Sequence, residues 1–561
     1  MIKTILLAIA VFICMPTVQA RMLPKDFAVL NHTQVMFEYD QVPGASKYLL
    51  TIKEEPASEK TPMVFSSSSL AYLVTNGLIF GRNYQWKVEA QQNGKTIHST
   101  AWLNFSIAWS SKIDTAFARY TITAPDKNAY NNDLLFIDHL GVIINRMGQP
   151  VWYFPDDKLP VSNDQFNFRA MRMTHDGTLT FIYNGRSMER ALDGFPIWDA
   201  PANTSLSGAA SETYHHDLQK MPDGSYITCG YHFSTEPHYL NSNLQANVRY
   251  NTVLQFNSRG SLLWFWNEKD HVDKATIFRN YSSVETEIAG THLNGFDVNP
   301  FDSSMVLSFR NTSEVLKIDM NNFGRVVYGW RPSPKVETGI NFSAQHGPAI
   351  TREGNIIIYN NNISADRSKV RNPKVLIVSN PSGTKPSEKI WEYEIAWSKK
   401  PEGVQGKEGY ALQLPNKNIL VNVGGAERMF EITPDKRIVW DCTYEKYDTA
   451  THTWKPFFNY RCGNISSLYP RYFTLAKIYS SKETASNSFR INNDGTDADL
   501  YEVEVSDAIG NIIDQRKVSV QPGAFATVTI GKSKKAKPAE PGTKVKVWPV
   551  NSLMQARIMG Y

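Results

Sequence analysis

A short sequence motif that ends in tryptophan recurs along the middle of the chain. A turn residue is followed by apolar positions and then Trp, in six copies: Gly148–Trp152, Gly194–Trp198, Gly260–Trp264, Gly324–Trp330, Glu388–Trp391 and Lys436–Trp440. Most copies follow a second pair of short apolar segments around an Asp-Gly-like turn, as in HDGTLTFI and PDGSYITC. Four short strands in each of six repeats predict an all-β fold, a six-bladed β-propeller.

The ring of such a propeller must close. Residues 134–153 supply only half a blade, so we expect the segment 465–478 to supply the missing strands from the other end. The alternative fold is a chain of separate β-sandwiches. That alternative does not explain why the same sequence motif occurs six times.

Short strand patterns continue on both sides of the repeats. The order of Ala45, Tyr48, Tyr84, Trp86 and Phe105 resembles a fibronectin type III-like β-sandwich. After residue 480 the pattern indicates a further small β-domain. The predicted organisation is therefore an N-terminal β-sandwich at 21–110, the catalytic propeller at 111–482 and a C-terminal β-domain at 483–561.

Residues 1–20 have the pattern of a secretory signal peptide. Lys3 gives a positive start, Ile5 to Met15 are mostly apolar, and Val18-Gln-Ala20 forms a small-residue cleavage site. We therefore expect a periplasmic or secreted protein; the alternative is a retained membrane anchor. No other run of about 18 apolar residues occurs, so no membrane span is expected.

The net charge and the cysteines limit the partners and cofactors that we expect. The formal charge of the 561 residues is only +5, and no basic-aromatic array is present, so we expect no nucleic-acid partner. Cys442 and Cys462 bracket a polar, loop-like segment, and we predict a disulfide between them. Cys229 lies in a strand-like stretch and is expected to be a buried free thiol. No CxxC pair and no nucleotide-binding glycine motif occurs, so no cofactor and no structural zinc are predicted.

Three histidines occupy nearly equivalent positions in consecutive repeats. His216 and His346 each lie eight residues before a turn glycine, and His292 precedes its turn with about three extra residues. Such positions converge at one mouth of a propeller. Three imidazoles could hold a metal, or could surround an anion that one of them attacks. Arg310, on the strand after His292, favours the anion, because a guanidinium pairs with tetrahedral anions and repels a divalent cation.

These segments resemble a known family. THLNGFDVNPFDSSMVLSFRNTSEVLKID is similar to the central motif of the bacterial arylsulfate sulfotransferases, and HHDLQKMPDGSYI and QHGPAITREGNIIIYNN are similar to its flanking histidine motifs. YRCGNISSLYP resembles the end that closes its propeller. The resemblance covers about residues 130–475.

The resemblance implies transfer of a sulfuryl group from a phenolic sulfate ester to a phenol, by a ping-pong mechanism through a sulfohistidine. His346 would be the nucleophile, and the sulfuryl oxygens would be bound by His292, Arg310 and His216. The substrate-binding residues would be Asn294, His215 and Tyr410. We expect Arg310 and protonated imidazoles to stabilise the charge that develops during transfer.

Two other functions stay open at this point. One is a metal-dependent propeller hydrolase or lyase acting on sugars, and the other is a non-catalytic propeller that binds a partner. A homodimer is also left open.

Overall fold

The computed structural model describes residues 22–561 except 57–60, 124–125, 132, 160–167, 202–212, 332–339, 364–370, 382–384, 397–406, 425, 427, 480–483, 531–539, 551 and 553–554. The predicted signal peptide at 1–20 lies outside the described residues.

The described chain is almost entirely β-structure, which confirms the predicted all-β class. Its short helices are η1 (Ser111–Ile113), η2 (Asp138–Leu140), η3 (Asp156–Lys158), α1 (Glu268–His271) and α2 (Lys274–Ile277). None of the helices in the described ranges is long and apolar enough to cross a membrane.

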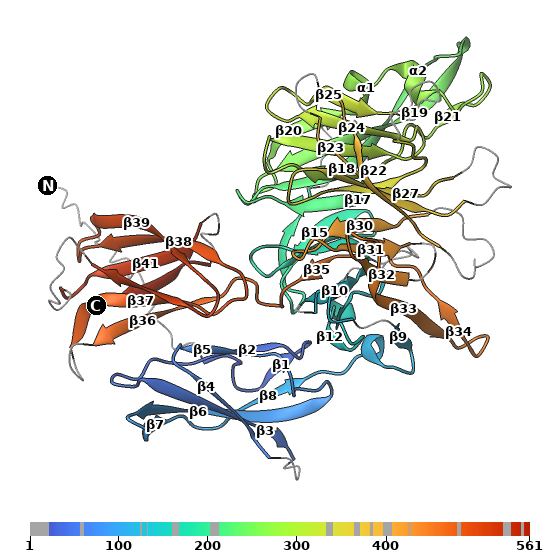
Figure 1. Cartoon of the computed structure of the whole chain (residues 1–561). Helices are drawn as coiled ribbons and strands as arrows, with labels where there is room; N and C mark the ends of the chain where they lie inside the picture. The colour runs from blue at the N-terminus through green and yellow to red at the C-terminus, as the bar shows by residue number, and fades with distance from the viewer. Residues whose placement is uncertain are drawn as a thin grey trace, which may run out of the picture.

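Six sheets follow one another through the middle of the described chain (Figure 1). The first contains β10 (Leu134–Ile137), β11 (Val142–Asn145), β12 (Pro150–Tyr153) and β35 (Asn464–Ile465). The second contains β13 (Phe168–Met173), β14 (Leu179–Tyr183), β15 (Arg186–Arg190) and β16 (Pro196–Asp199). The third contains β17 (Thr213–Lys220), β18 (Tyr226–His238), β19 (Asn241–Phe256), β20 (Leu262–Asn267) and β21 (Glu287–Ile288).

The remaining three sheets have the same order. The fourth contains β22 (Leu293–Val298), β23 (Ser304–Phe309), β24 (Glu314–Asp319) and β25 (Arg325–Trp330). The fifth contains β26 (His346–Ile350), β27 (Ile356–Asn360), β28 (Lys374–Val378) and β29 (Lys389–Glu394). The sixth contains β30 (Tyr410–Gln413), β31 (Ile419–Val423), β32 (Arg428–Ile432), β33 (Ile438–Asp448), β34 (Thr453–Pro456) and β9 (Ala118–Ile122).

Burial differs systematically across each sheet. The second strands β27 and β31 are mostly apolar and are buried along their whole length. The outer strand β25 alternates exposed and partly buried positions. The first strands β13, β17, β22, β26 and β30 contact one another in chain order. In the second to sixth sheets, the first strand therefore lies against the first strand of the neighbouring sheet, and outer strands such as β25 and β29 are more exposed.

The recurrent tryptophans join neighbouring sheets. The indole Nε1 of Trp152 donates to the carbonyl oxygen of Leu192 at 2.8 Å, and that of Trp391 donates to Pro434 at 2.8 Å. Trp440, in the sixth sheet, donates to the carbonyl oxygen of Arg146 at the end of the first sheet, at 2.9 Å. The tryptophans of the repeated motif thus connect each of these sheets to the next, and the last sheet to the first, by hydrogen bonds.

The first sheet is completed by a shorter segment than predicted. Only β35 pairs with β10, through Leu134 with Ile465 and Leu135 with Asn464. The rest of the predicted closing segment includes β36 (Phe473–Tyr479), which pairs with β37 (Ala485–Asn493) instead. The C-terminal sheets therefore begin upstream of residue 483, the predicted boundary.

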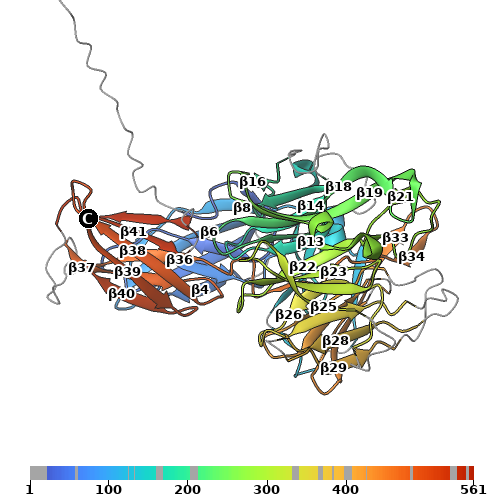
Figure 2. The ribbon, with the colours of Figure 1, turned by 90° about the horizontal axis from the view of Figure 1, so that it is seen from above.

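The two ends of the described chain form sheets that lie beside each other and beside the six central sheets (Figures 1 and 2). The N-terminal strands are β1 (Ala28–Leu30), β2 (Val35–Glu38), β3 (Lys47–Glu55), β4 (Met63–Ser67), β5 (Ala71–Val74), β6 (Arg82–Gln92), β7 (Lys95–Ser99) and β8 (Leu103–Ile107). The other C-terminal strands are β38 (Asp499–Ser506), β39 (Ile512–Val520), β40 (Phe525–Thr529), β41 (Lys544–Pro549) and β42 (Arg557–Gly560). Arg557 connects these two ends through a bidentate ion pair with the buried Glu38. Its Nη1 and Nη2 atoms lie 2.5 and 3.0 Å from the two carboxylate oxygens.

The prediction of a disulfide is wrong. Cys442 and Cys462 are both free, buried thiols, so the predicted disulfide does not form. Their sulfur atoms contact different backbone oxygens: Cys442 approaches Thr443, whereas Cys462 approaches Tyr410 and Leu420. The segment between them is not a free loop, because much of it belongs to β33 and β34, which pair with each other; Cys442 lies in β33 and Cys462 beyond β34. Cys229 is buried and free, as predicted.

Candidate functional site

The site is built on irregular first strands of neighbouring sheets. The pairing of β13, β17, β22 and β26 with the next strand shifts register near the start of each first strand. His216 lies in such a shift and His292 directly precedes β22; their φ angles of 62° and 63° fall in the left-handed region that non-glycine residues rarely adopt. Bulges of this kind re-aim a side chain and are common beside active sites.

The structure brings the three predicted histidines together. The ring centroids of His216 and His292 are 5.0 Å apart, and those of His216 and His346 are 6.3 Å apart. The ring of Tyr460 lies against both His216 and His346, at 6.3 and 5.1 Å. Side chains from the third, fourth and fifth sheets, and from the closing segment, therefore share one small volume.

Hydrogen bonds determine which nitrogen carries the proton in three imidazoles. His346 Nδ1 lies 2.8 Å from the carbonyl oxygen of Gly409, which can only accept, so Nδ1 carries the proton and Nε2 keeps its lone pair. His215 Nε2 donates to the carbonyl oxygen of Gly230 at 3.1 Å. Its Nδ1 therefore accepts from Nδ1 of His216, at 2.6 Å, and His216 is likewise left with a lone pair on Nε2.

Burial keeps these imidazoles uncharged. Desolvation lowers the pKa of His346 to about 3, and the nearby charge of Arg461 contributes. Desolvation also lowers the pKa of His215 to about 3 and that of His292 to about 4, with Arg310 adding to the effect at His292. The pKa of His216 falls well below 6.5 because of burial and its histidine neighbours. The expectation of protonated imidazoles is therefore wrong for the ligand-free site; its permanent positive charge comes from arginines.

Arg310 lies where the sequence predicted it. It follows β23, and its backbone N–H donates to the carbonyl oxygen of His292 at 2.9 Å. Its charge contributes to the lowered pKa of both His292 and His346. An anion held among these three groups would meet a fixed positive charge and one imidazole lone pair.

Asn294 supports His346 through the backbone. The fully buried amide donates from Nδ2 to the carbonyl oxygen of Gln345 at 2.7 Å, and its Oδ1 accepts from the N–H of Gly347 at 3.4 Å. His346 lies between those two residues, so Asn294 holds the turn of chain that carries it. Tyr410 packs its ring against the same Gly347 and is 4 % exposed, which places it under the site.

An ion-pair network lies beneath the histidines. Arg461 donates to Asp217 at 2.6 Å and to the carbonyl oxygen of Asn294 at 3.1 Å, and Arg172 lies 3.2 Å from the same carboxylate. Asp217 is completely buried, and the two guanidinium groups lower the pKa of its carboxyl. This network connects β13, β17 and β22 to the segment that follows the sixth sheet.

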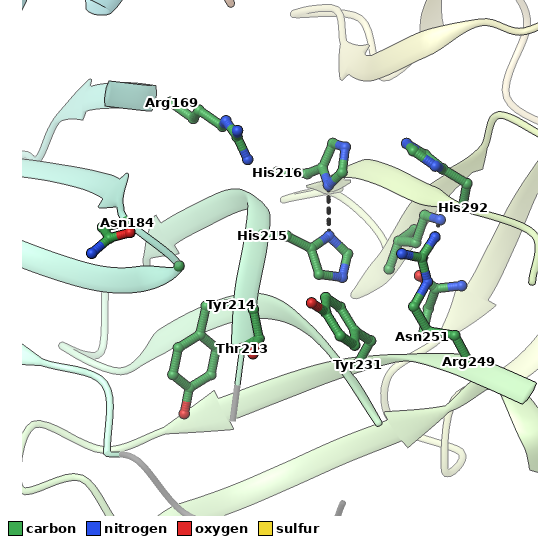
Figure 3. Close-up of a pocket in the computed structure, with 12 residues that line it drawn as sticks. Arg169, Asn184, Thr213, Tyr214, His215, His216, Tyr231, Arg249, Asn251 and His292 are labelled. Carbon is green, nitrogen blue, oxygen red and sulfur yellow. Dashed lines mark hydrogen bonds between the residues drawn. The ribbon is translucent and has the colours of Figure 1, made fainter. Parts of the chain in front are cut away.

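A cavity of about 370 Å³ opens beside the histidines (Figure 3). Its walls come from the second, third and fourth sheets. They are formed by Arg169, Asn184, Gly185, Thr213, Tyr214, His215, His216, Tyr231, Arg249, Asn251, His292 and Leu293. The predicted residues His215, His216 and His292 lie in this wall; Tyr410 is not part of it.

Sequence reasoning missed several of these groups. Arg461 and Tyr460 belong to the YRCGN motif of the closing segment, and that motif was the only signal that pointed to them. Tyr231 lies on β18 and Arg249 on β19, at positions without a counterpart in the other repeats. Among the residues that the structure describes, no group of three or more His, Cys, Asp and Glu is arranged to hold a metal ion.

The site thus gathers uncharged imidazoles beside arginine side chains. Residues 119–395 match the sequence model of the arylsulfotransferase (ASST) family, and this segment contains His216, His292, Arg310 and His346. Over this segment, the chain belongs to the arylsulfotransferase family. Among curated proteins, no sequence matches the chain.

Several solved structures share distant similarity with the chain. A streptogramin B lyase has 12% sequence identity and a TM-score of 0.32, with 57% of this chain and 87% of the lyase covered. Virginiamycin B lyase from Staphylococcus aureus has 8% identity and a TM-score of 0.29, with coverages of 70% and 94%. The β-propeller domain of Cps50 (Swd1) from Myceliophteria thermophila has 10% identity and a TM-score of 0.29, with coverages of 62% and 86%. Scores this low carry no inference about function.

Proposed function

We propose that this chain is an arylsulfate sulfotransferase that works by a ping-pong mechanism through a sulfohistidine at His346. The family match supports sulfuryl transfer in general. The observation that carries the finer proposal is the hydrogen bond from His346 Nδ1 to Gly409, because it leaves a nucleophilic lone pair on Nε2.

We also propose that the six central sheets are the blades of a closed six-bladed propeller. The contacts between successive first strands support this arrangement. The pairing of β10 with β35 and the hydrogen bond from Trp440 to Arg146 both join the last part of the ring to the first. A closed ring gives the site its rigidity, since each histidine comes from a different blade.

In the first half-reaction, His346 Nε2 attacks the sulfur of the aryl sulfate. The N–S bond forms as the bond from sulfur to the aryl oxygen breaks, and the phenolate leaves with the electron pair. Charge spreads over the three equatorial oxygens of the sulfuryl group, as in phosphoryl transfer. Arg310 stabilises this charge, and His292 adds a polar contact.

In the second half-reaction, an acceptor phenol attacks the sulfur of the sulfohistidine. Its oxygen forms the new S–O bond while the N–S bond breaks and returns the electron pair to His346. The lone pair on His216 Nε2 accepts the phenol's proton. His215 holds that ring in the required tautomer and so acts as a positioning residue.

The rival functions make different predictions. A metal-dependent hydrolase or lyase would lose its activity to a chelator, and a non-catalytic binding module would show no turnover. The positive charge of Arg310, which contributes to the lowered pKa of His292 and His346, favours an anion over a divalent cation. The sequence of residues 1–20 supports our further proposal that the protein is exported to the periplasm or secreted.

The test is an incubation of the protein with 4-nitrophenyl sulfate and phenol, with and without EDTA. We expect nitrophenol release that depends on phenol, is unaffected by EDTA, and is matched by formation of phenyl sulfate. His346→Asn should abolish release, whereas His98→Asn, on the exposed β7 strand, should not change it. Release that EDTA abolishes would favour the hydrolase, and full activity of His346→Asn would refute the nucleophile assignment.

A further inference from the structure

The position of the His292 ring depends on its backbone. His346 and His215 are each held by a hydrogen bond between a ring nitrogen and a backbone carbonyl oxygen. In the described part of the chain, no such hydrogen bond reaches a ring nitrogen of His292. Its imidazole packs edge-on against that of His216, with the ring centroids 5.0 Å apart. The direction of this imidazole therefore follows from the left-handed backbone at His292, a conformation that surrounding contacts must maintain.

The third sheet contacts the segment that leads to His292 (Figure 1). Strands β18 and β19 pair with each other well beyond the residues that pair with β17 and β20, so they continue outward as a hairpin. Strand β21 pairs in parallel with this hairpin at Asn247 and Val248. Arg249 donates from Nε and Nη2 to the carbonyl oxygen of Ala289, at 3.2 and 2.9 Å. The backbone before His292 is thus attached to the neighbouring sheet.

A buried carboxyl group connects the residues on both sides of His292. Glu268 belongs to α1 and is completely buried. One of its oxygens accepts a hydrogen bond from the hydroxyl group of Thr291, the residue before His292. The other accepts from the backbone N–H and the side-chain Nδ2 of Asn251, at 2.8 and 2.6 Å. Asn251 Oδ1 in turn accepts from the backbone N–H of Leu293, the residue after His292, at 3.3 Å.

The surroundings of Glu268 suit a rigid support. Burying a carboxyl group is costly unless its oxygens are hydrogen-bonded, and here three donors approach the two oxygens. A polar network whose hydrogen bonds are complete is rigid. Asn251 and His292 lie in the cavity wall, whereas Glu268 and Thr291 do not (Figure 3). The network therefore lies behind the cavity and reaches it through Asn251 and His292.

We propose that Glu268 is a positioning residue, which acts through Thr291 and Asn251 to hold His292 in the conformation that directs its imidazole at the sulfuryl group. The inference rests on the proposed sulfuryl transfer, because that proposal gives His292 its contact with the sulfuryl oxygens. Without the network, the backbone at His292 relaxes toward a commoner conformation and its ring turns away from His216. The third sheet thus prepares a side chain that the fourth sheet carries.

Thr291→Val tests the network with a small change of shape. The substitution removes the hydroxyl group that donates to Glu268 and keeps the volume of the side chain, whereas Thr291→Ser keeps the hydroxyl group. Thr474→Val is the matched control. Thr474 is as buried as Thr291, and it donates to the carboxylate of Asp494 at 2.7 Å in the C-terminal sheets. Urea unfolding identifies conditions under which all three variants are folded, and the kinetics are measured there.

The kinetic measurement uses 4-nitrophenyl sulfate and phenol. For Thr291→Val, kcat should fall about tenfold, the effect of weakening one hydrogen bond to a charged group, while KM changes by about twofold or less. The loss falls on kcat because charge develops on the sulfuryl oxygens in the transition state. Thr291→Ser should recover most of kcat, and Thr474→Val should leave it unchanged. Equal kcat values for Thr291→Val and Thr474→Val would overturn the proposal.

Magnetic resonance of histidine-labelled protein separates this inference from the proposed function, because it needs no transfer. The measured quantity is the nuclear Overhauser effect between the ring protons of His216 and His292. It should weaken in Thr291→Val and in Glu268→Ala, and it should persist in Thr291→Ser and Thr474→Val. This result supports the positioning role even if the protein transfers no sulfuryl group. An unchanged effect in Thr291→Val refutes the role even if transfer occurs.

Discussion

At the scale of single residues, the chemistry depends on which ring nitrogen keeps its lone pair. The carbonyl oxygens of Gly409 and Gly230 set the tautomers of His346 and, through His215, of His216. Burial and the neighbouring arginines then keep both rings unprotonated. A nucleophile prepared in this way is reactive without a base to remove its proton.

This account predicts the acid side of the pH profile for the first half-reaction. The pKa of His346 lies near 3, below its ordinary value of 6.5, so the reactive neutral form persists as the pH falls and is lost only as the pH passes through about 3. The value of kcat/KM for 4-nitrophenyl sulfate, whose leaving group needs no proton, should stay level from pH 8 to pH 5. A fall centred near pH 6.5 would show that His346 titrates like an exposed histidine.

At the scale of elements, the register shifts at the starts of β13, β17, β22 and β26 set the site's geometry. Gly347 lies in the shift of β26 with φ of 53°, and a Cβ there would come within 2.9 Å of the ring of Tyr410. Glycine is therefore required both by the left-handed backbone and by the neighbouring ring.

A pair of glycine substitutions separates these two requirements. Gly224→Ala, in a turn with φ of 81° and no atom near the added carbon, should cost only about 1 kcal/mol of unfolding free energy. Gly347→Ala should cost more, and should also lower kcat at least tenfold because the clash displaces His346. Urea denaturation and steady-state kinetics measure both effects. Equal losses of stability, with kcat unchanged in Gly347→Ala, would mean that the turn does not position the nucleophile.

The sequence predicted the elements better than it predicted their ends. The tryptophan motif identified the repeats, because its tryptophan makes the contact between each sheet and the next. The closing strand was predicted too long, because the apolar pattern of 473–479 fits either a central sheet or the C-terminal sheet with which it pairs. The three histidines were found because register with the turn glycines is visible in sequence. Arg461 and Arg249 were not predicted, because their positions depend on pairing between distant strands and on an extended hairpin.

At the scale of the whole molecule, one ion-pair network joins the beginning and the end of the central sheets. Arg461, beyond the sixth sheet, is buried against Asp217 of the third sheet and contacts the fourth through Asn294. Removing one partner of a buried ion pair leaves the other charge uncompensated, which costs about 3–5 kcal/mol.

The network predicts an order of stabilities. Arg461→Met should lower the free energy of unfolding by several kcal/mol, because Arg461 is almost completely buried. Arg172→Met should cost less, since its side chain is 30% exposed and Arg461 still compensates Asp217. Thermal and urea unfolding of both variants would measure the difference. The reverse order would show that Arg461 does not hold the ring together.

The central claim is that His346 carries the sulfuryl group between the two half-reactions. The most direct measurement is mass spectrometry of the protein quenched at alkaline pH after reaction with 4-nitrophenyl sulfate in the absence of an acceptor. We predict one added SO₃ group on the peptide that contains His346, its disappearance when phenol is added before the quench, and no label in His346→Asn. Release of nitrophenol without any labelled histidine, or with the label on another residue, would contradict the account.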